Sequence, residues 1–404
     1  MSAGTTKTFY PPHRVLMGPG PSDVPSRVLD AISRPTIGHL DPEFANMMEE
    51  LKGLLRYAFK TQNAITFPVS GPGSVGMETC FVNLINPGEK VIVCRNGVFG
   101  GRMIENVERC GGIAVVVEDA WGKAVDPGKL EDALKAHPDT KVVAFVHAET
   151  STGALSDAET LCKIARNHGC LTIVDAVTSL GGSPLKVDEW GIDAIYSGSQ
   201  KCLSCPPGLS PVSFSEAAIA KIKTRSGKVQ SWFMDLNLVL GYWGTGSGAP
   251  RTYHHTAPTN SLYGLHESLV ILQEEGLENS WARHMRNHLA FRAGLESMGL
   301  NFLVDEAHRL PQLNSVFIPQ GVDEKALRKT LLDQHRLEIG AGLGDFAGKV
   351  WRFGLMGYSN RVENVVYCLN ALEAAFTATG MKLERGAAVV AAHQVYAAQA
   401  KAGD

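Results

Sequence analysis

Two residues with complementary chemistry follow two short hydrophobic segments of the chain. Asp175 ends the segment Leu171–Asp175, and Lys201 follows the segment Ala194–Tyr196 after Ser-Gly-Ser-Gln. They are 26 residues apart, about one strand–helix–strand step, so we expect them at neighbouring strand ends. A lysine amine can hold an aldehyde as a Schiff base, and a buried carboxylate can keep a pyridine nitrogen protonated. Each residue alone has a structural explanation, as a helix cap or a snorkelling lysine, but together they indicate pyridoxal phosphate chemistry.

A glycine-rich turn supplies a candidate phosphate site. The run Ser70-Gly71-Pro72-Gly73-Ser74 precedes a helical pattern over 75–84, and backbone N–H groups at a helix start bind phosphate. Gly73 permits close approach, and we expect Ser74 to cap the helix and to donate its hydroxyl. The turn matches neither a P-loop, which needs a Gly-Lys-Ser/Thr run, nor a dinucleotide fingerprint, because the preceding strand is predicted to be short and broken by Pro68.

The elements that must position these groups alternate regularly along the chain. Hydrophobic runs rich in β-branched residues predict strands at 90–94, 113–117, 141–147, 171–175 and 194–196, and helical patterns at 129–135 and 158–167 lie between them. This alternation is typical of parallel βαβ units whose helices cover both faces of the sheet. A long, mostly helical stretch over 262–295 leads to a smaller α+β unit, and an Ala-rich helical tail over 383–402 follows.

Composition narrows the class of protein. The 404 residues are 44% hydrophobic and 20% charged with a net charge of −3, which suits a globular enzyme and disfavours nucleic acid as a partner. No apolar run reaches membrane-spanning length, and residues 1–10 lack the apolar region of a signal peptide. We therefore expect a cytoplasmic protein with eight reduced cysteines and no membrane partner. The spacing Cys202-x-x-Cys205 is not followed by a second pair, so we expect no metal site.

Four ordered motifs carry a resemblance to a known family. The sequence resembles alanine–glyoxylate and serine–glyoxylate aminotransferases, which are class V, fold-type I pyridoxal phosphate enzymes, from Leu16 to about Thr379. The motifs are Ser-Gly-Ser-Gln-Lys at 197–201, His-Ala-Glu-Thr-Ser-Thr-Gly at 147–153, Tyr-His-His-Thr at 253–256 and Trp-Arg-Phe-Gly-Leu at 351–355.

The resemblance implies a fold and a domain organisation. We expect an α/β fold-type I transferase with a mostly parallel seven-stranded sheet flanked by helices, and a smaller C-terminal α+β domain. The implied boundaries are an N-terminal arm over 1–20 that contributes to the active site, a large cofactor-binding domain over 21–280, and a small domain with the Ala-rich tail over 281–404. The resemblance also implies a homodimer with shared active sites.

The family pattern transfers to individual residues of this chain. Lys201 resembles the Schiff-base lysine, which then acts as general acid and base, and Asp175 resembles the partner of the pyridine nitrogen. The other cofactor-binding positions implied by the resemblance are Gly73, Ser74 and Gln200 at the phosphate, Thr150 at the ring hydroxyl, Phe99 stacked on the ring, and Tyr253 and Thr256 reaching the phosphate from the neighbouring subunit.

Arg352 is the predicted anchor for substrate. A guanidinium pairs bidentately with a carboxylate, which the amino donor and the keto acceptor both carry, and the flanking Trp351 and Phe353 disfavour a surface position. The backbone around Gly20 is a second candidate anchor. His254 and His255 lack an acidic or cysteine partner at a matching spacing, so we expect them to be structural rather than metal ligands.

These assignments predict transfer of the amino group of alanine or serine to glyoxylate by a ping-pong mechanism. A dicarboxylate would need a second arginine near the site, for which Arg251 is the remaining candidate. Ureidoglycine–glyoxylate and 2-aminoethylphosphonate–pyruvate transaminases are alternatives that the sequence leaves open. A desulfurase or lyase is disfavoured because the segment 339–344 has no cysteine. A non-enzymatic phosphate-ligand protein would leave Lys201, Asp175 and Arg352 unexplained.

Overall fold

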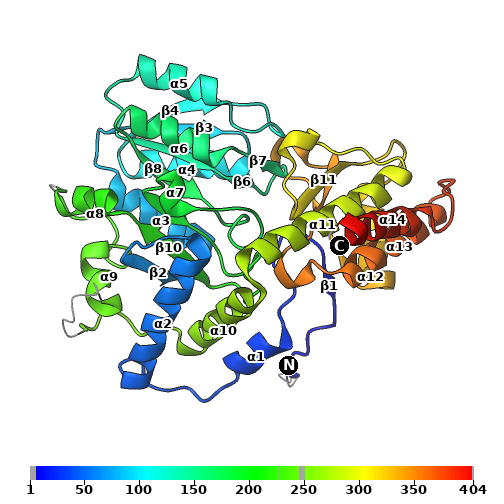
Figure 1. The fold of residues 1–404 in the computed structure, drawn as a ribbon, viewed down its shortest axis with the longest axis horizontal. Helices are drawn as coiled ribbons and strands as arrows, with labels where there is room; N and C mark the ends of the chain where they lie inside the picture. Colours follow the sequence, from blue (N-terminus) through cyan, green and yellow to red (C-terminus); the bar gives the residue numbers. More distant parts are fainter. Residues whose placement is uncertain (1–5, 226, 245–250, 403–404) are drawn as a thin grey trace, which may run out of the picture.

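A seven-stranded, mostly parallel sheet forms the centre of the larger part of the molecule (Figure 1). The computed structural model describes residues 6–225, 227–244 and 251–402. The strand order is β2 (Ile65–Ser70), β10 (Leu209–Phe214), β9 (Ala194–Tyr196), β8 (Leu171–Asp175), β5 (Val142–Val146), β3 (Lys90–Arg95) and β4 (Ile113–Glu118). β10 runs antiparallel to both of its neighbours, whereas the strands from β9 to β4 are parallel. The expected α/β fold is confirmed.

Helices cover both faces of this sheet. α3 (Gly73–Leu84) and α4 (Val98–Arg109) pack on one face, and α5 (Pro127–Ala136), α6 (Ala158–Asn167) and α7 (Val187–Trp190) pack together on the other. Right-handed crossovers that run in opposite directions along the sheet require this division. The short strands β6 (Ala148–Glu149) and β7 (Ala154–Leu155) pair after β5, and further helices are α1 (Ser26–Ile32), α2 (Pro42–Phe59), α8 (Glu216–Lys223), α9 (Leu236–Trp243) and α10 (Thr259–Glu275).

A smaller antiparallel sheet orders the C-terminal part. Its strands follow the order β11 (Leu313–Phe317), β14 (Val350–Gly354) and β13 (Gly340–Ala341), and β1 (Val15–Leu16) pairs separately with β12 (Leu337–Glu338). The helices here are α11 (Leu277–Ser297), α12 (Glu324–His335), α13 (Val362–Ala378) and α14 (Ala387–Ala402). The Glu373 carboxylate of α13 accepts hydrogen bonds from Gly386 N and Ala388 N, so α13 caps the first turn of the Ala-rich tail helix.

Two hydrophobic cores correspond to these two sheets. The larger core lies between Val28 and Leu277, and the second joins Met17 to buried residues between 290 and 392. Leu277 belongs to the first core and Phe291 to the second, so α11 passes from one to the other. We propose that the domain boundary expected between residues 280 and 281 falls within this helix. Among the described residues, no helix combines the length and apolarity that crossing a membrane requires.

Three local expectations need correction or refinement. β2 is not short or broken: it spans six residues with Pro68 inside it, because β2 is an edge strand and Pro68 lies opposite Pro211 of β10. Ser74 is not a helix cap, since α3 begins at Gly73 after Pro72. The helical stretch over 262–295 consists of two helices, because Gly276 between them has a φ of +86°.

Candidate active site

The polar residues that follow the parallel strands meet in one cavity. The carboxyl ends of β8 and β9 lie at the same edge of the sheet as the turn that begins α3, which is where open α/β sheets bind ligands. The cavity has a volume of about 210 Å³. It is lined by Pro72, Gly73, Ser74, Met77, Phe99, Arg102, Asp175, Val177, Tyr196, Gln200 and Lys201. The structure thus brings together six of the predicted cofactor-binding positions.

Lys201 reaches the cavity from the loop after β9. Its side chain is buried, and its ammonium contacts the carbonyl oxygen of Pro19 in the N-terminal arm. Burial, together with the charge of Arg352, lowers the pKa of Lys201 to about 8. A larger fraction of this amine is therefore unprotonated near neutral pH than for a solvated lysine, and an unprotonated amine is the form that attacks an aldehyde.

Asp175 lies at the end of β8 with its carboxylate fixed in place. One oxygen accepts a hydrogen bond from Val177 N at 2.8 Å, and the other accepts one from the Tyr196 hydroxyl at 2.8 Å. Burial, with a smaller contribution from nearby Glu149, raises the pKa of Asp175 to about 7 against the opposing effect of these hydrogen bonds. A cationic ring nitrogen placed against this carboxylate would offset the cost of burying its charge.

The start of α3 presents a backbone cradle. The helix begins at Gly73 without a side-chain cap from the described residues, so N–H groups of its first turn remain available to an anion. A Cβ built on Gly73 would lie 3.1 Å from a methyl carbon of Val177, so a side chain there would crowd the cavity wall. Gln200 is also at the cavity, and its buried Oε1 has no hydrogen-bond partner among the described residues.

Phe99 and Arg102 both line the cavity from α4. The Arg102 guanidinium lies 4.8 Å from the centre of the Phe99 ring. Glu149, the last residue of β6, is fully buried and accepts a hydrogen bond from Phe99 N at 3.2 Å, while the Ser151 hydroxyl accepts one from Val98 N at 3.0 Å. These two side chains accept hydrogen bonds from backbone N–H groups in the first turn of α4, and so they hold Phe99 in position at the cavity.

Sequence reasoning missed the roles of Glu149 and Tyr196. Both contribute through contacts between segments far apart in the sequence, since Glu149 binds α4 and Tyr196 binds Asp175. A Cβ built on Gly97, just before α4, would lie 2.4 Å from the Glu149 carboxyl carbon. The signal available in the sequence was the pairing of Gly97 with an acidic residue in the 147–153 motif, and its meaning depended on knowing that the two segments touch.

Arg352 lies on β14 and joins the smaller sheet to the cavity loops. Its side chain is 6% exposed, and burial lowers its pKa to about 10. Nε donates to the Ala341 carbonyl at 2.7 Å and Nη1 donates to the Thr150 carbonyl at 3.1 Å. Nη2 has no hydrogen-bond partner in the part of the chain that the structure describes, so this edge of the guanidinium can receive a carboxylate.

Thr150 and Gly20 complete the surroundings of these groups. The Thr150 hydroxyl forms a short hydrogen bond with the Thr178 hydroxyl, which follows β8. Gly20 has a φ of +102°, and a Cβ built on it would lie 2.7 Å from Lys201 Nζ. Only glycine fits both the torsion and the approach of the arm to the lysine.

Tyr253 and Thr256 are exposed and do not line the cavity of their own chain. His254 stacks on Trp232 with ring centres 4.4 Å apart and contacts His255 through its Nδ1 at 2.8 Å. No cluster of metal-ligating side chains occurs among the described residues. None of the eight cysteines, all within the described ranges, forms a disulfide.

Comparison with known proteins identifies the family. The fold and the solved structures it resembles define a fold-type I pyridoxal phosphate enzyme. A family model described as Aminotransferase class-V matches residues 14–363, and the chain belongs to this family of pyridoxal phosphate-dependent aminotransferases.

Three relatives show how near the resemblance is. The chain is 40% identical to alanine–glyoxylate aminotransferase of Oryctolagus cuniculus over 373 residues, and this match covers 91% of this chain and 94% of that protein. The crystal structure of alanine–glyoxylate aminotransferase from Nostoc sp. has a TM-score of 0.89 and 43% identity, covering 92% of this chain and 97% of that one. The crystal structure of ureidoglycine–glyoxylate aminotransferase from Bacillus subtilis has a TM-score of 0.94 and 38% identity, and the match covers 96% of this chain and 100% of that one.

Proposed function

We propose that the cavity holds pyridoxal phosphate between Lys201 and Asp175. The Lys201 amine would hold the aldehyde carbon, and the Asp175 carboxylate would pair with the protonated ring nitrogen. The free N–H groups of Gly73 and Ser74 would bind the phosphate with Gln200, Thr150 would donate to the ring hydroxyl, and the Phe99 ring would stack on the cofactor. The raised pKa of Asp175 supports this assignment, because it shows that burying the charged carboxylate is unfavourable and that a cationic partner would stabilise it.

The catalytic role of Lys201 follows from its position and its lowered pKa. When bound, the cofactor supplies an electron sink for the bond that breaks at the substrate Cα. Once the donor's amino group has replaced the Lys201 amine at the aldehyde carbon, the freed amine would take the Cα proton as a general base and deliver it to that aldehyde carbon as a general acid. An amine whose pKa is about 8 suits both directions of transfer near neutral pH.

We propose that the substrates are alanine or serine as the donor and glyoxylate as the acceptor. The observation that carries this proposal is Arg352, which is buried, fixed by two carbonyls and left with one guanidinium edge for a single carboxylate. Arg251, the candidate for a second anchor, pairs instead with Glu49 at 2.6 Å and contacts backbone carbonyls. A donor with one carboxylate and a small side chain matches this arrangement.

Ureidoglycine is the second donor with specific support. The similarity to the ureidoglycine–glyoxylate enzyme of B. subtilis, at a TM-score of 0.94, favours it on the same footing as the alanine enzymes. Ureidoglycine also carries one carboxylate, so the Arg352 contact serves either donor. 2-Aminoethylphosphonate carries no carboxylate, so the Arg352 contact does not favour it.

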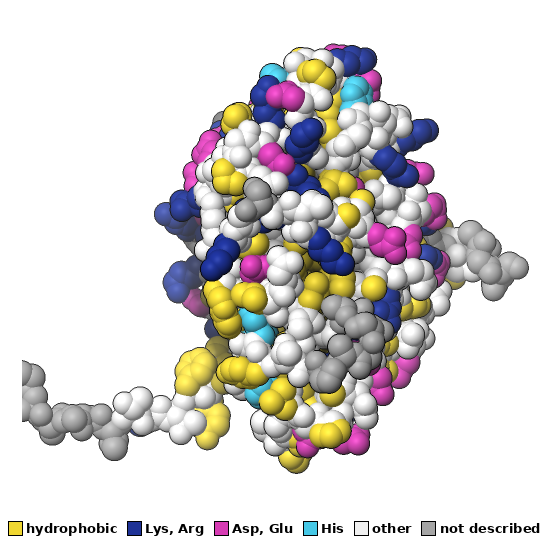
Figure 2. All heavy atoms as spheres, turned by 90° about the vertical axis from the view of Figure 1, so that its left-hand side faces the viewer, with side chains coloured by type: hydrophobic (Ala, Val, Ile, Leu, Met, Phe, Trp, Pro, Cys, Tyr) yellow, Lys and Arg dark blue, Asp and Glu magenta, His cyan; other side chains and the backbone are white. Residues whose placement is uncertain are grey.

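We propose a homodimer in which Tyr253 and Thr256 reach the neighbouring subunit's phosphate site. Tyr253 is 67% exposed, and Trp232 and Leu238 are also exposed nearby in the sequence. Figure 2 shows hydrophobic side chains gathered on the lower part of the face that carries α9, with few charged groups among them. Such a patch supports burial against a second copy.

The test is the identity of the products. Holoenzyme would be incubated with carbon-labelled glyoxylate and, separately, with alanine, serine, ureidoglycine, 2-aminoethylphosphonate and aspartate. We expect labelled glycine with alanine or serine, and pyruvate or hydroxypyruvate in equal amount. If labelled glycine forms only in the incubation with ureidoglycine, then ureidoglycine is the donor instead of alanine or serine. Absence of glycine with every donor would refute glyoxylate as the acceptor.

A further inference from the structure

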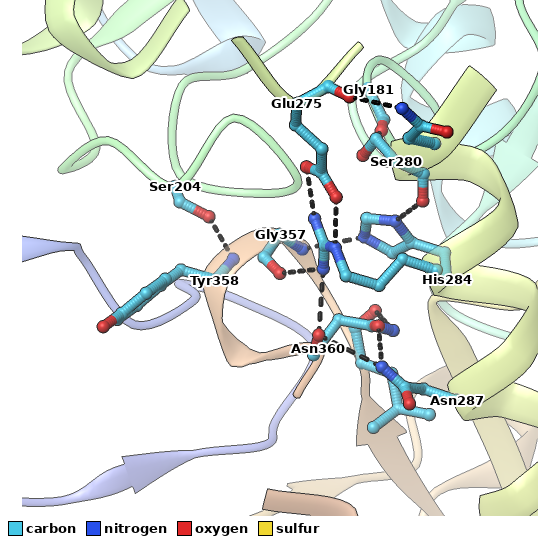
Figure 3. Close-up of polar contacts among 12 residues, drawn as sticks. Gly181, Ser204, Glu275, Ser280, His284, Asn287, Gly357, Tyr358 and Asn360 are labelled. Atoms are coloured by element: carbon cyan, nitrogen blue, oxygen red, sulfur yellow. Dashed lines mark hydrogen bonds and ion pairs between the residues drawn. The ribbon is translucent and has the colours of Figure 1, made fainter. Parts of the chain in front are cut away.

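The segment that follows Lys201 is joined to the segment that follows Arg352. Ser204 lies three residues after the lysine, and Tyr358 lies six residues after the arginine. The Tyr358 backbone N–H donates to the Ser204 hydroxyl at 2.6 Å (Figure 3). One hydrogen bond therefore spans the junction between the two sheets and connects the two segments that carry the proposed catalytic and substrate groups.

Ser204 has a backbone conformation that requires support. Its φ is +56°, a left-handed value that costs a non-glycine residue about 1 kcal/mol or more. Its N–H donates to the Lys201 carbonyl at 3.0 Å, and the Ser22 hydroxyl donates to the same carbonyl at 2.8 Å. Ser204 thus closes a tight turn over residues 201–204, which begins at Lys201 itself. The turn sets the direction in which the Lys201 side chain points.

Gly357 allows the two segments to approach this closely. Its φ is +51°, and a Cβ built on it would lie 2.0 Å from the Ser204 hydroxyl oxygen and 2.7 Å from the Cys202 carbonyl oxygen. Any side chain at this position would push the two segments apart.

α11 holds the Gly357 turn from the other side. Gly357 N donates to His284 Nε2 at 2.9 Å, and His284 Nδ1 donates to the Ser280 carbonyl at 2.7 Å. Burial lowers the pKa of His284 to about 3, so the ring stays neutral and Nε2 remains an acceptor. Arg283 Nη1 donates to the Gly357 carbonyl at 2.8 Å, while Nε and Nη2, on one edge of the guanidinium, both donate to the Glu275 carboxylate.

Packing contributes little on one side of this junction. A cavity of about 280 Å³ borders it, with Leu203, Ser204, Gly357 and Tyr358 among its lining residues. Because van der Waals contacts are missing there, hydrogen bonds carry more of the positioning than they would in a filled core.

We propose that Ser204 is a positioning residue for Lys201. Its hydroxyl, held by the Gly357–Tyr358 turn, keeps the lysine amine aligned with the aldehyde carbon of the cofactor and at a fixed place relative to Arg352. The inference rests on the proposed function where it concerns Arg352. The effect of Ser204 on Lys201 requires only that the cofactor binds.

The test measures how fast Lys201 joins the cofactor, without any amino donor. Apoenzyme would be mixed with pyridoxal phosphate in a stopped-flow instrument, with binding followed by protein fluorescence and lysine attachment by absorbance. Ser204→Gly removes the hydroxyl and tolerates the positive φ. We expect it to slow attachment about tenfold while fluorescence-detected affinity changes less than about twofold, since misplacement of a reacting group is felt in the rate. Gly357→Ala should give the same pattern from the other segment.

Ser213→Ala is the matched control. Ser213 is buried, and its hydroxyl accepts a hydrogen bond from Asn63 at 3.1 Å, but it lies on β10 opposite Ile195, toward the end of the strands that points away from Lys201. We expect its attachment rate to equal that of the unchanged protein. Attachment by Ser204→Gly within twofold of the unchanged protein, or equal slowing by Ser213→Ala, would overturn the proposal. If attachment is normal in the unchanged protein but alanine and serine give no glycine, the donor assignment fails and this inference stands.

Discussion

Replacing Arg352 by lysine isolates the contribution of its two-pronged contact with substrate. Lysine keeps the positive charge but cannot hold Ala341 O and Thr150 O while also presenting two parallel donors to a carboxylate. A hydrogen bond to a charged group contributes about 1.5–3 kcal/mol. The loss of one such bond, about 2 kcal/mol, corresponds to a KM about 30-fold higher.

The same KM increase should occur for the donor and for the acceptor. Each carries one carboxylate, and Arg352 is proposed to bind both in successive half-reactions. Steady-state assays would vary alanine at saturating glyoxylate and then glyoxylate at saturating alanine. Arg352→Ala should raise both KM values further, because it also removes the charge.

Two measurements separate this effect from a general loss of structure. Arg328→Lys, on the surface of α12 where Arg328 pairs with Glu324, makes the same chemical change and should leave both KM values unchanged. Urea unfolding of Arg352→Lys should show a loss of about 1–3 kcal/mol, because one buried carbonyl loses its donor. A KM increase confined to one substrate would refute the shared anchor, and unchanged KM values would refute Arg352 as an anchor at all.

Three further predictions concern the cofactor site. Lys201→Ala should still bind pyridoxal phosphate in equilibrium dialysis but should lose turnover at least about a hundredfold; undiminished turnover would exclude Lys201 as the acid–base group. As pH rises from about 4 to about 7, the free energy of unfolding of the apoenzyme should fall, relative to that of Asp175→Asn, by about 1.4 kcal/mol per pH unit. The reason is that the Asp175 carboxyl of the unfolded chain releases its proton near pH 4, whereas that of the folded chain keeps it to about pH 7. Urea unfolding of both apoenzymes across this range measures the difference, and parallel curves would contradict the raised pKa. Tyr253→Phe should weaken cofactor binding about tenfold in fluorescence titrations of the apoenzyme without changing the sedimentation coefficient. Unchanged affinity would rule out a phosphate contact through the Tyr253 hydroxyl.

The sequence predicted the parts of the fold that depend on local pattern. The structure contains the expected strands that end at Asp175 and Tyr196 and the expected helix over 158–167. These elements could be predicted because their hydrophobic pattern depends only on residues close together in the sequence. The meeting of Asp175 and Lys201 in one cavity followed from their positions at the ends of adjacent strands.

The features that the sequence did not predict depend on tertiary contacts. Pro68 looked like a strand breaker, but the strand is at the edge of the sheet, where one side of the backbone needs no partner. The support that Glu149 gives to Phe99 requires β6 to contact the start of α4. The link between Ser204 and Tyr358 joins residues 154 positions apart, and no periodicity reports such a contact.

A half-reaction spectrum shows whether the protein takes an amino group from alanine or serine. Holoenzyme would be titrated with L-alanine, L-serine and L-aspartate in the absence of any keto acid, with Lys201→Ala as the control. We expect alanine or serine to convert the absorption of the bound pyridoxal form to that of the pyridoxamine form, and glyoxylate to reverse the change. Neither aspartate nor the control should show it. A spectrum that stays unchanged with both alanine and serine, or changes equally in Lys201→Ala, would contradict this expectation.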